Sequence, residues 1–276
     1  MMNIKIPVIY LSIIGFLIPF PLVAGETETG ETNGLTESQA GARELLMDMG
    51  EFLSQTKQFS VTIESGYEAV QESGQKIEFN TNRTILVDRP NNLRVESEKS
   101  SGDTSLTLID GKTITYSNLT QNVYAQTAHT GDLDAAMKYL IGDLHIRLPL
   151  AALFNSQLPE DLENRMQEID YVEDTGIFGV PAHHLAGSTD TVDFQIWITD
   201  DETPLPIRII LSYKFEEGQP RYWADFIDWN LSPEISKSSF AFTPPEGATK
   251  IEFLAQLSKQ GVKPREEAAA EAGEQP

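Results

Sequence analysis

Segments in which apolar and polar residues alternate fill the first half of this chain, and only tight turns separate them. Phe59–Ala69 and Lys76–Asp88 show the period of two that is typical of a strand with one buried face. The pair Asp110-Gly111 is typical of a hairpin turn, here between Leu106–Ile109 and Lys112–Ser117. Such short gaps force neighbouring strands to be antiparallel, because a parallel pair needs a long crossover. The first half is therefore predicted to be an antiparallel meander, which also includes Leu93–Lys99 and Val123–Thr127.

Strands resume in the second half, after a middle section with helical patterns. Asp132 is a suitable N-cap for one helix, and two further short helical segments are predicted at Leu150–Phe154 and Leu162–Met166. The later predicted strands are Ile169–Thr175, Ala182–Gly187, Val192–Thr199, Ile207–Phe215, Arg221–Leu231, Phe240–Phe242 and Lys250–Phe253. A total of about ten or eleven strands predicts a mainly β (α+β) fold, a large curved antiparallel sheet with helices against one face.

A helix is predicted to open the folded region. Thr36 is a good N-cap and Gln39 follows three residues later, which is the spacing of a capping box. Leu45, Met49 and Phe52 then recur at intervals of three and four residues, so the helix has one apolar face. We expect this face to cover part of the sheet.

The first residues have the three parts of an export signal. Lys5 supplies a positive charge, an apolar run extends from Ile6 to Ile18, and small residues end at Gly25. Spanning a bilayer takes about 20 apolar residues, so we expect cleavage near Gly25, with an uncleaved anchor as the alternative. The predicted boundaries are a signal peptide at residues 1–25, a flexible lead-in at 26–35, a single β domain at 36–257 and a disordered acidic tail at 258–276.

Charge and cysteine content exclude several kinds of partner and chemistry. The chain has 42 acidic and 20 basic residues, a formal net charge of −22, which repels nucleic acids and anionic membranes. It contains no cysteine, which excludes disulfides, thiolate metal sites and a lipid-modified cysteine after the signal. We therefore expect no nucleic-acid binding and no stable membrane insertion after signal cleavage.

Two of the later strands carry large apolar groups on both faces. The segment from Tyr222 to Trp229 has this pattern, and so does Val192–Ile198, in which Trp197 lies opposite its apolar neighbours. A sheet with one solvated face alternates cleanly. The pattern leaves two alternatives, namely covering helices or a ligand cavity between sheet and helices.

Four segments together resemble a family of predicted periplasmic bacterial proteins of unknown function in the lipoprotein-carrier (LolA-like) superfamily. They are residues 110–126, 179–187, 195–214 and 228–248. The resemblance implies a half-open antiparallel β-barrel of about eleven strands, with helices as a lid and an apolar interior. Members of the superfamily carry lipoproteins or lipids across the periplasm, or sense mislocalised lipoproteins. This chain lacks the lipid-anchor cysteine of an outer-membrane acceptor and shows no counterpart of a carrier's docking motif.

No catalytic site is predicted. The chain contains no nucleophile elbow, zinc-binding helix motif or phosphate loop. The pair His183-His184 is a candidate metal site. However, adjacent strand residues point to opposite faces, so both rings cannot readily bind one ion. We expect one ring to be packed or hydrogen-bonded inward and the other to face solvent, with no metal and no cofactor.

These observations predict a periplasmic carrier or sensor that binds a lipid, lipoprotein acyl chain or other apolar ligand between sheet and helices. The alternative is a non-catalytic interaction module that binds an envelope polypeptide in its concave face, and a hydrolase is a third, remote alternative. The candidate ligand-binding residues are Leu45, Met49 and Phe52 on the first helix and Trp197, Tyr222, Trp223, Phe226 and Trp229 on strands.

Overall fold

The computed structural model describes residues 35–144 and 150–253. The predicted signal peptide and most of the lead-in lie outside these residues, as does the predicted acidic tail. Within the described ranges, no helix has both the length and the apolar character needed to cross a membrane.

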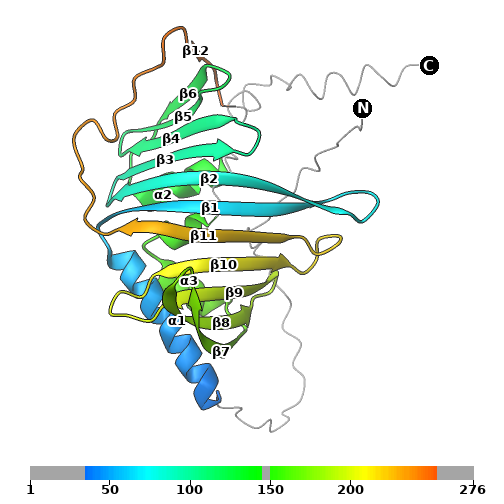
Figure 1. Cartoon of the computed structure of the whole chain (residues 1–276). Helices are drawn as coiled ribbons and strands as arrows, with labels where there is room; N and C mark the ends of the chain where they lie inside the picture. Colours follow the sequence, from blue (N-terminus) through cyan, green and yellow to red (C-terminus); the bar gives the residue numbers. More distant parts are fainter. Residues whose placement is uncertain (1–34, 145–149, 254–276) are drawn as a thin grey trace, which may run out of the picture.

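A single curved sheet forms the framework of the protein (Figure 1). Its strands are β1 (Gln58–Val70), β2 (Lys76–Asp88), β3 (Asn92–Lys99), β4 (Thr104–Asp110), β5 (Thr113–Asn118), β6 (Val123–Ala128), β7 (Glu168–Ile177), β8 (Val180–Ser188), β9 (Val192–Thr199), β10 (Pro206–Tyr213), β11 (Arg221–Asn230) and β12 (Thr249–Lys250). Their order across the sheet is β12-β6-β5-β4-β3-β2-β1-β11-β10-β9-β8-β7. The two ends of this order do not pair with each other, so the sheet is a half-open barrel, as predicted.

Two meanders meet at the centre of the sheet. The first runs outward from β1 to β6, and the second runs inward from β7 to β11, so that β11 pairs with β1. All of these pairs are antiparallel, because every connection within a meander is short. The exception is β12, which pairs with β6 in parallel. The predicted antiparallel sheet is wrong at this edge, because the chain reaches β12 by a long crossover.

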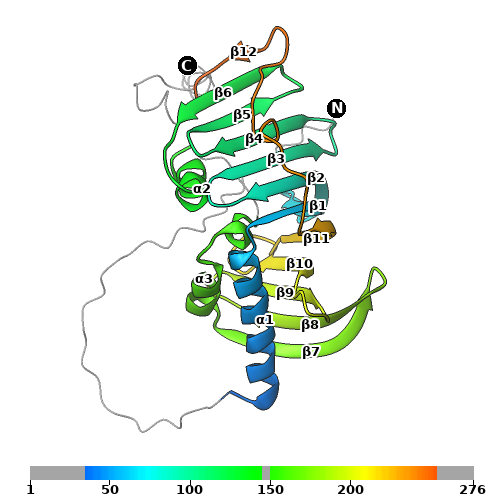
Figure 2. The ribbon, with the colours of Figure 1, turned by 90° about the vertical axis from the view of Figure 1, so that its left-hand side faces the viewer.

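Helices lie against one face of the sheet, which we call the inner face (Figure 2). The first helix, α1 (Glu37–Gln55), starts at the predicted capping box, with Thr36 and Gln39 bonded reciprocally. It crosses β7 and β9 and contacts the two short helical pieces. Those pieces are η1 (Ala151–Phe154) and α3 (Leu158–Arg165), and α2 (Leu133–Gly142) lies near the other half of the sheet.

The inner face carries the core. Phe59, Val61 and Ile63 of β1 are nearly inaccessible to solvent, as are Leu46 and Met49 of α1. These side chains belong to one continuous apolar cluster that joins strands and helices. Burial of this surface, at about 25 cal/mol per Å², is what holds the helices on the sheet.

The segment between β11 and β12 covers part of the opposite, outer face. It crosses from the centre of the sheet to its far edge (Figure 2). Arg94 of β3 donates to the Ser239 carbonyl, and Tyr124 of β6 packs against Phe242, with 5.3 Å between ring centroids. The predicted strand at Phe240–Phe242 is wrong, because this segment lies over the sheet and does not extend it.

Candidate functional site

A row of large side chains crosses the inner face over five neighbouring strands. Strand register places Phe194 of β9 beside Leu211 of β10, and Leu211 beside Tyr222 of β11. Tyr222 lies beside Tyr67 of β1, which stacks on Phe79 of β2 with 5.6 Å between ring centroids. We call these five residues the inner row. Tyr222 is buried, whereas the other four are only partly buried, so the row combines apolar character with access to solvent.

Gly187 makes room for one end of the inner row. It pairs with Phe194, and a Cβ atom at Gly187 would lie 2.5 Å from the ring of Phe194. The absence of a side chain on β8 therefore lets the Phe194 ring lie flat across the neighbouring strand.

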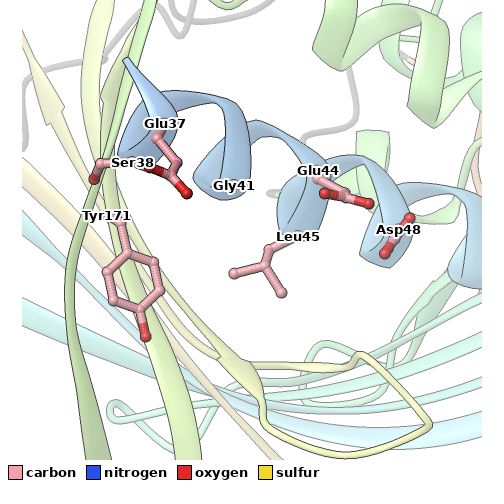
Figure 3. A pocket seen from close by; sticks show the side chains of 7 residues that line it. All are labelled: Glu37, Ser38, Gly41, Glu44, Leu45, Asp48 and Tyr171. Atoms are coloured by element: carbon pink, nitrogen blue, oxygen red, sulfur yellow. The ribbon is translucent and has the colours of Figure 1, made fainter. Parts of the chain in front are cut away.

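A pocket lies between α1 and the inner face of β7. Its volume is about 350 Å³, which is near the lower end of the range for small-molecule sites. Leu45 points from α1 into the space below the helix, and Tyr171 faces it from the sheet (Figure 3). The remaining lining residues are Glu37, Ser38, Gly41, Glu44 and Asp48. The pocket thus has an apolar floor and an acidic rim.

The predicted ligand-binding residues of α1 differ in exposure. Leu45 lines the pocket, and Phe52 is partly buried against the core. Met49 is fully buried between helix and sheet, where it supports the packing of α1.

Three predicted residues of β11 share the inner face. Tyr222 and Phe226 are buried there by the normal alternation of a strand. Trp229 joins them because Asp228, with φ of 55°, interrupts that alternation at a register shift between β1 and β11. The rings of Phe226 and Trp229 stack with centroids 6.0 Å apart, and Trp229 Nε1 donates to the Pro206 carbonyl at 3.0 Å.

The other two predicted residues, Trp197 and Trp223, lie on the outer face. Trp197 stacks on His184, with ring centroids 4.0 Å apart and planes 10° from parallel. Trp223 lies under the guanidinium of Arg208 at 5.7 Å and donates to Glu78 at 3.1 Å. The structure therefore does not bring these two tryptophans together with the inner-face residues. Among the described residues, the planar side chains of His184 and Arg208 lie on these two tryptophans.

Sequence reasoning missed four members of the inner row, namely Phe194, Leu211, Tyr67 and Phe79. A signal for them was present, since Tyr67 is in phase with the buried Phe59, Val61 and Ile63 along one strand. The paired positions on the neighbouring strands identify the other members of the inner row, but only once the register of the sheet is known.

The two adjacent histidines face opposite sides of the sheet. His183 lies between two carboxylates, with Nδ1 2.9 Å from Asp174 Oδ1 and Nε2 3.2 Å from Asp200 Oδ1. His184 is packed against Trp197 and lies 3.1 Å from Gln195. The prediction that one ring faces solvent is wrong, because both rings are mostly covered by partners on their own face.

Tyr171 joins the His183 cluster at the edge of the pocket. Burial raises the pKa of the Tyr171 phenol to about 12, and the hydrogen bond to Asp174 and the charges of Asp174 and Asp200 act in the same direction.

Within the described residues, no serine or threonine hydroxyl bonds to either histidine ring. Nor does this part of the chain bring three potential metal ligands together in a suitable group.

Fold and site define a class of protein: a mainly β half-barrel with helices against an apolar inner face. More particularly, the chain belongs to the family described as "Predicted periplasmic protein (DUF2092)", whose model matches residues 42–254. The family resemblance drawn from four sequence segments is thereby confirmed. Among curated proteins, none matches this sequence.

Several solved structures are similar in fold. An uncharacterized conserved protein from Thermus thermophilus has 12% identity and a TM-score of 0.44, over 77% of this chain and 99% of its own. A LolA superfamily protein from Nitrosomonas europaea has 13% identity and a TM-score of 0.35, over 73% and 97%. MucB, in its complex with MucA from Pseudomonas aeruginosa, has 15% identity and a TM-score of 0.41; the match covers 74% of this chain and 61% of that one.

Proposed function

We propose that this protein is a non-catalytic periplasmic binder of an apolar ligand, such as an acyl chain, held between the sheet and its helices. The observation that carries the proposal is the inner row, a band of aromatic and aliphatic side chains of which four are only partly buried. Apolar surface on a concave face is the usual feature of a small-molecule site. The predicted export signal, with cleavage near Gly25, supports the proposal, because free lipid outside the cytoplasm must be shielded from water.

The expected driving force is removal of apolar surface from water. Each methylene of an acyl chain contributes about 0.8 kcal/mol when it is buried. Leu45 and Tyr171 extend the apolar surface toward the pocket under α1. A ligand along the inner row would therefore meet apolar side chains from both sheet and helix.

Binding of the fluorescent apolar probe N-phenyl-1-naphthylamine tests the proposal. Phe79→Ala removes one partly exposed ring of the inner row, and we expect several-fold weaker probe binding. Trp223→Ala is the matched control, because it removes an aromatic ring from the outer face. Unchanged affinity in Phe79→Ala, or equal losses in both variants, would contradict a site on the inner face.

Native mass spectrometry of protein purified from its own periplasm gives an independent test. We expect a population whose mass exceeds that of the chain by one bound lipid. Recovery of ligand-free protein alone, together with no probe binding, would overturn the proposal. N-terminal sequencing of the same sample checks cleavage near Gly25.

A polypeptide ligand is the second candidate, and the exposed edge strand β7 favours it. Val172 on this strand is 48% exposed, and Phe178 just after it is 58% exposed. An extended peptide is able to add to such an edge through main-chain hydrogen bonds. Co-purification of a peptide instead of a lipid in the same mass spectra would select this candidate.

A further inference from the structure

An arginine without a carboxylate partner lies beside the inner row. Arg83 projects from β2 on the inner face, in register with the buried Ile63 of β1. Its Nη1 donates to Ser65 Oγ at 2.7 Å, and the Ser65 hydroxyl in turn donates to the Thr81 carbonyl at 3.1 Å. Among the described residues, no carboxylate lies within ion-pair distance of Arg83. The guanidinium is thus held by a neutral oxygen, with further N–H donors to spare.

This arrangement is unusual for a chain in which 42 acidic residues face 20 basic ones. Four other arginines each lie near a carboxylate: Arg43 near Glu163, Arg94 near Glu96, Arg208 near Asp225 and Arg221 near Glu68. Arg89 has a structural role, since its Nε donates at 3.1 Å to the Thr56 carbonyl at the end of α1. Arg165 is exposed in the last turn of α3, at a helix end. Among the described arginines, Arg83 alone has neither a carboxylate partner nor a helix end.

The surroundings of Arg83 are apolar and aromatic on one side. Burial lowers the pKa of Arg83, and the neighbouring Tyr222 opposes that effect. Burial likewise raises the pKa of the Tyr222 phenol, against the charge of Arg83 and a hydrogen bond with Ser65. Arg83, Tyr222 and Ser65 are therefore one cluster, and Tyr222 is a member of the inner row.

Small polar side chains lie on the other side. Strand register continues from Arg83 to Ser97 of β3, Ser105 of β4 and Asn118 of β5, all only partly buried. Hydroxyl and amide groups are suitable partners for the oxygens of a headgroup. Along this line of paired residues, the inner face therefore changes from the apolar Ile63 of β1 to polar side chains at Arg83.

We infer that Arg83 binds the monoanionic headgroup, a carboxylate or a phosphodiester, of an amphiphile whose hydrocarbon chain lies along the inner row. One unpaired guanidinium matches one negative charge, and its planar fork bonds either group bidentately. This inference rests on the proposed function and specifies its ligand class.

The matched probes are cis-parinaric acid and its methyl ester, which share a fluorescent hydrocarbon chain and differ in headgroup charge. We expect the wild-type protein, at pH 8, to bind the acid about tenfold more tightly than the ester. The net charge of −22 repels the negatively charged acid, so tighter binding of the acid than of the ester indicates a positive charge close to the bound headgroup.

Arg83→Gln removes the charge and retains hydrogen-bonding groups. We expect it to weaken binding of the acid about tenfold, to leave the ester unchanged and to leave the melting temperature no lower. Arg83→Lys keeps the positive charge but lacks the planar guanidinium, and it should retain part of the preference for the acid over the ester. Arg221→Gln is the control, because it removes the same charge from the outer face.

The outcomes separate the two proposals. If neither probe binds the wild-type protein, the apolar-ligand function fails and the inference about Arg83 fails with it. If both probes bind equally, or Arg83→Gln keeps the acid preference, only the Arg83 inference is overturned. Lysophosphatidylglycerol as competitor distinguishes the headgroups: displacement of the acid supports a site open to phosphodiesters, and lack of displacement supports one restricted to carboxylates.

Discussion

Trp223 of β11 lies directly over Gly66 of β1, its partner in the register of the sheet. A Cβ atom at Gly66 would be 2.5 Å from Trp223 Nε1 and 2.8 Å from the side-chain amide of Asn80. The indole is held in this place by the Arg208 guanidinium above it and by its hydrogen bond to Glu78. The missing side chain of Gly66 is therefore what allows the outer-face tryptophan to pack flat on the sheet.

Replacing Gly66 with alanine should destabilise the fold. The new methyl group displaces the Trp223 ring and its two partners, and overpacking of this kind costs about 1–3 kcal/mol. Urea unfolding measures the loss. Gly176→Ala on β7 is the matched control, since no atom lies within 4 Å of its added Cβ, and it should change stability by less than about 0.5 kcal/mol. Equal effects of the two substitutions would mean that the loss arises from the backbone and not from contact with Trp223.

Period-two patterns were sufficient to predict most of the sheet. The segment Lys76–Asp88 was predicted with the limits that β2 has, because its alternation and flanking turns are both unambiguous. The final strand predicted at Lys250–Phe253 overlaps β12 only at Lys250, and its parallel pairing with β6 and the crossover before it were not predicted. Their position depends on contacts such as that of Tyr124 with Phe242, between residues far apart in the sequence.

The candidate site was less predictable than the sheet. Strand β11 has large apolar groups on both faces, so its pattern does not say that Phe226 is inside and Trp223 outside. The backbone irregularity at Asp228 then places Trp229 on the same face as Phe226, against simple alternation. The sequence carries a signal for Arg83 that was not followed: this residue is in phase with Phe79 and Ile85 along the strand, so alternation puts it on the inner face.

Gly41→Ala should stabilise the protein by about 1 kcal/mol. Gly41 lies inside α1, where glycine is entropically unfavourable, and its added Cβ would meet no atom within 4 Å. Gly50→Ala in the same helix is the control, because its Cβ would lie 3.0 Å from Leu162 Cδ1 of α3. We expect the gain in helix propensity to be offset there by crowding. Thermal unfolding of both variants checks the difference, and equal gains would show that α3 moves freely away from α1.

Thr36→Ala should weaken the start of α1. The Thr36 hydroxyl accepts from the Gln39 amide nitrogen at 3.2 Å, and the Gln39 side chain accepts from the Thr36 amide at 3.1 Å. Loss of such a cap lowers stability by about 1 kcal/mol, which urea unfolding is able to resolve. Hydrogen exchange should rise first in the opening turn of α1, next to the pocket that this turn lines. Unchanged exchange in that turn would contradict a role for the cap.

Glu68 of β1 should make stability depend on pH. Its carboxylate accepts from the Arg221 amide at 2.9 Å and lies 3.0 Å from Lys76 Nζ. Partial burial acts to raise the pKa of Glu68, but the hydrogen bonds from Lys76 and Arg221 and their charges outweigh it, so the pKa lies below its ordinary value of 4.5. A lowered pKa in the folded state means that the carboxylate stabilises the fold above about pH 4.5, and that this contribution is lost as the pH falls through the folded-state pKa.

Glu68→Gln should therefore lower the free energy of unfolding at pH 7 by up to about 1 kcal/mol, the usual range for a surface ion pair, because both basic partners, Lys76 and Arg221, are exposed to solvent. At pH 3 the wild-type carboxyl group is increasingly protonated, and the difference between the two proteins should shrink. Urea unfolding at pH 7, 4.5 and 3 measures this trend, with Glu98→Gln on the exposed end of β3 as a control for the change in net charge. A difference that stays the same at pH 3 would mean that the glutamine disturbs packing between β1 and β11, and that the charge of Glu68 contributes nothing.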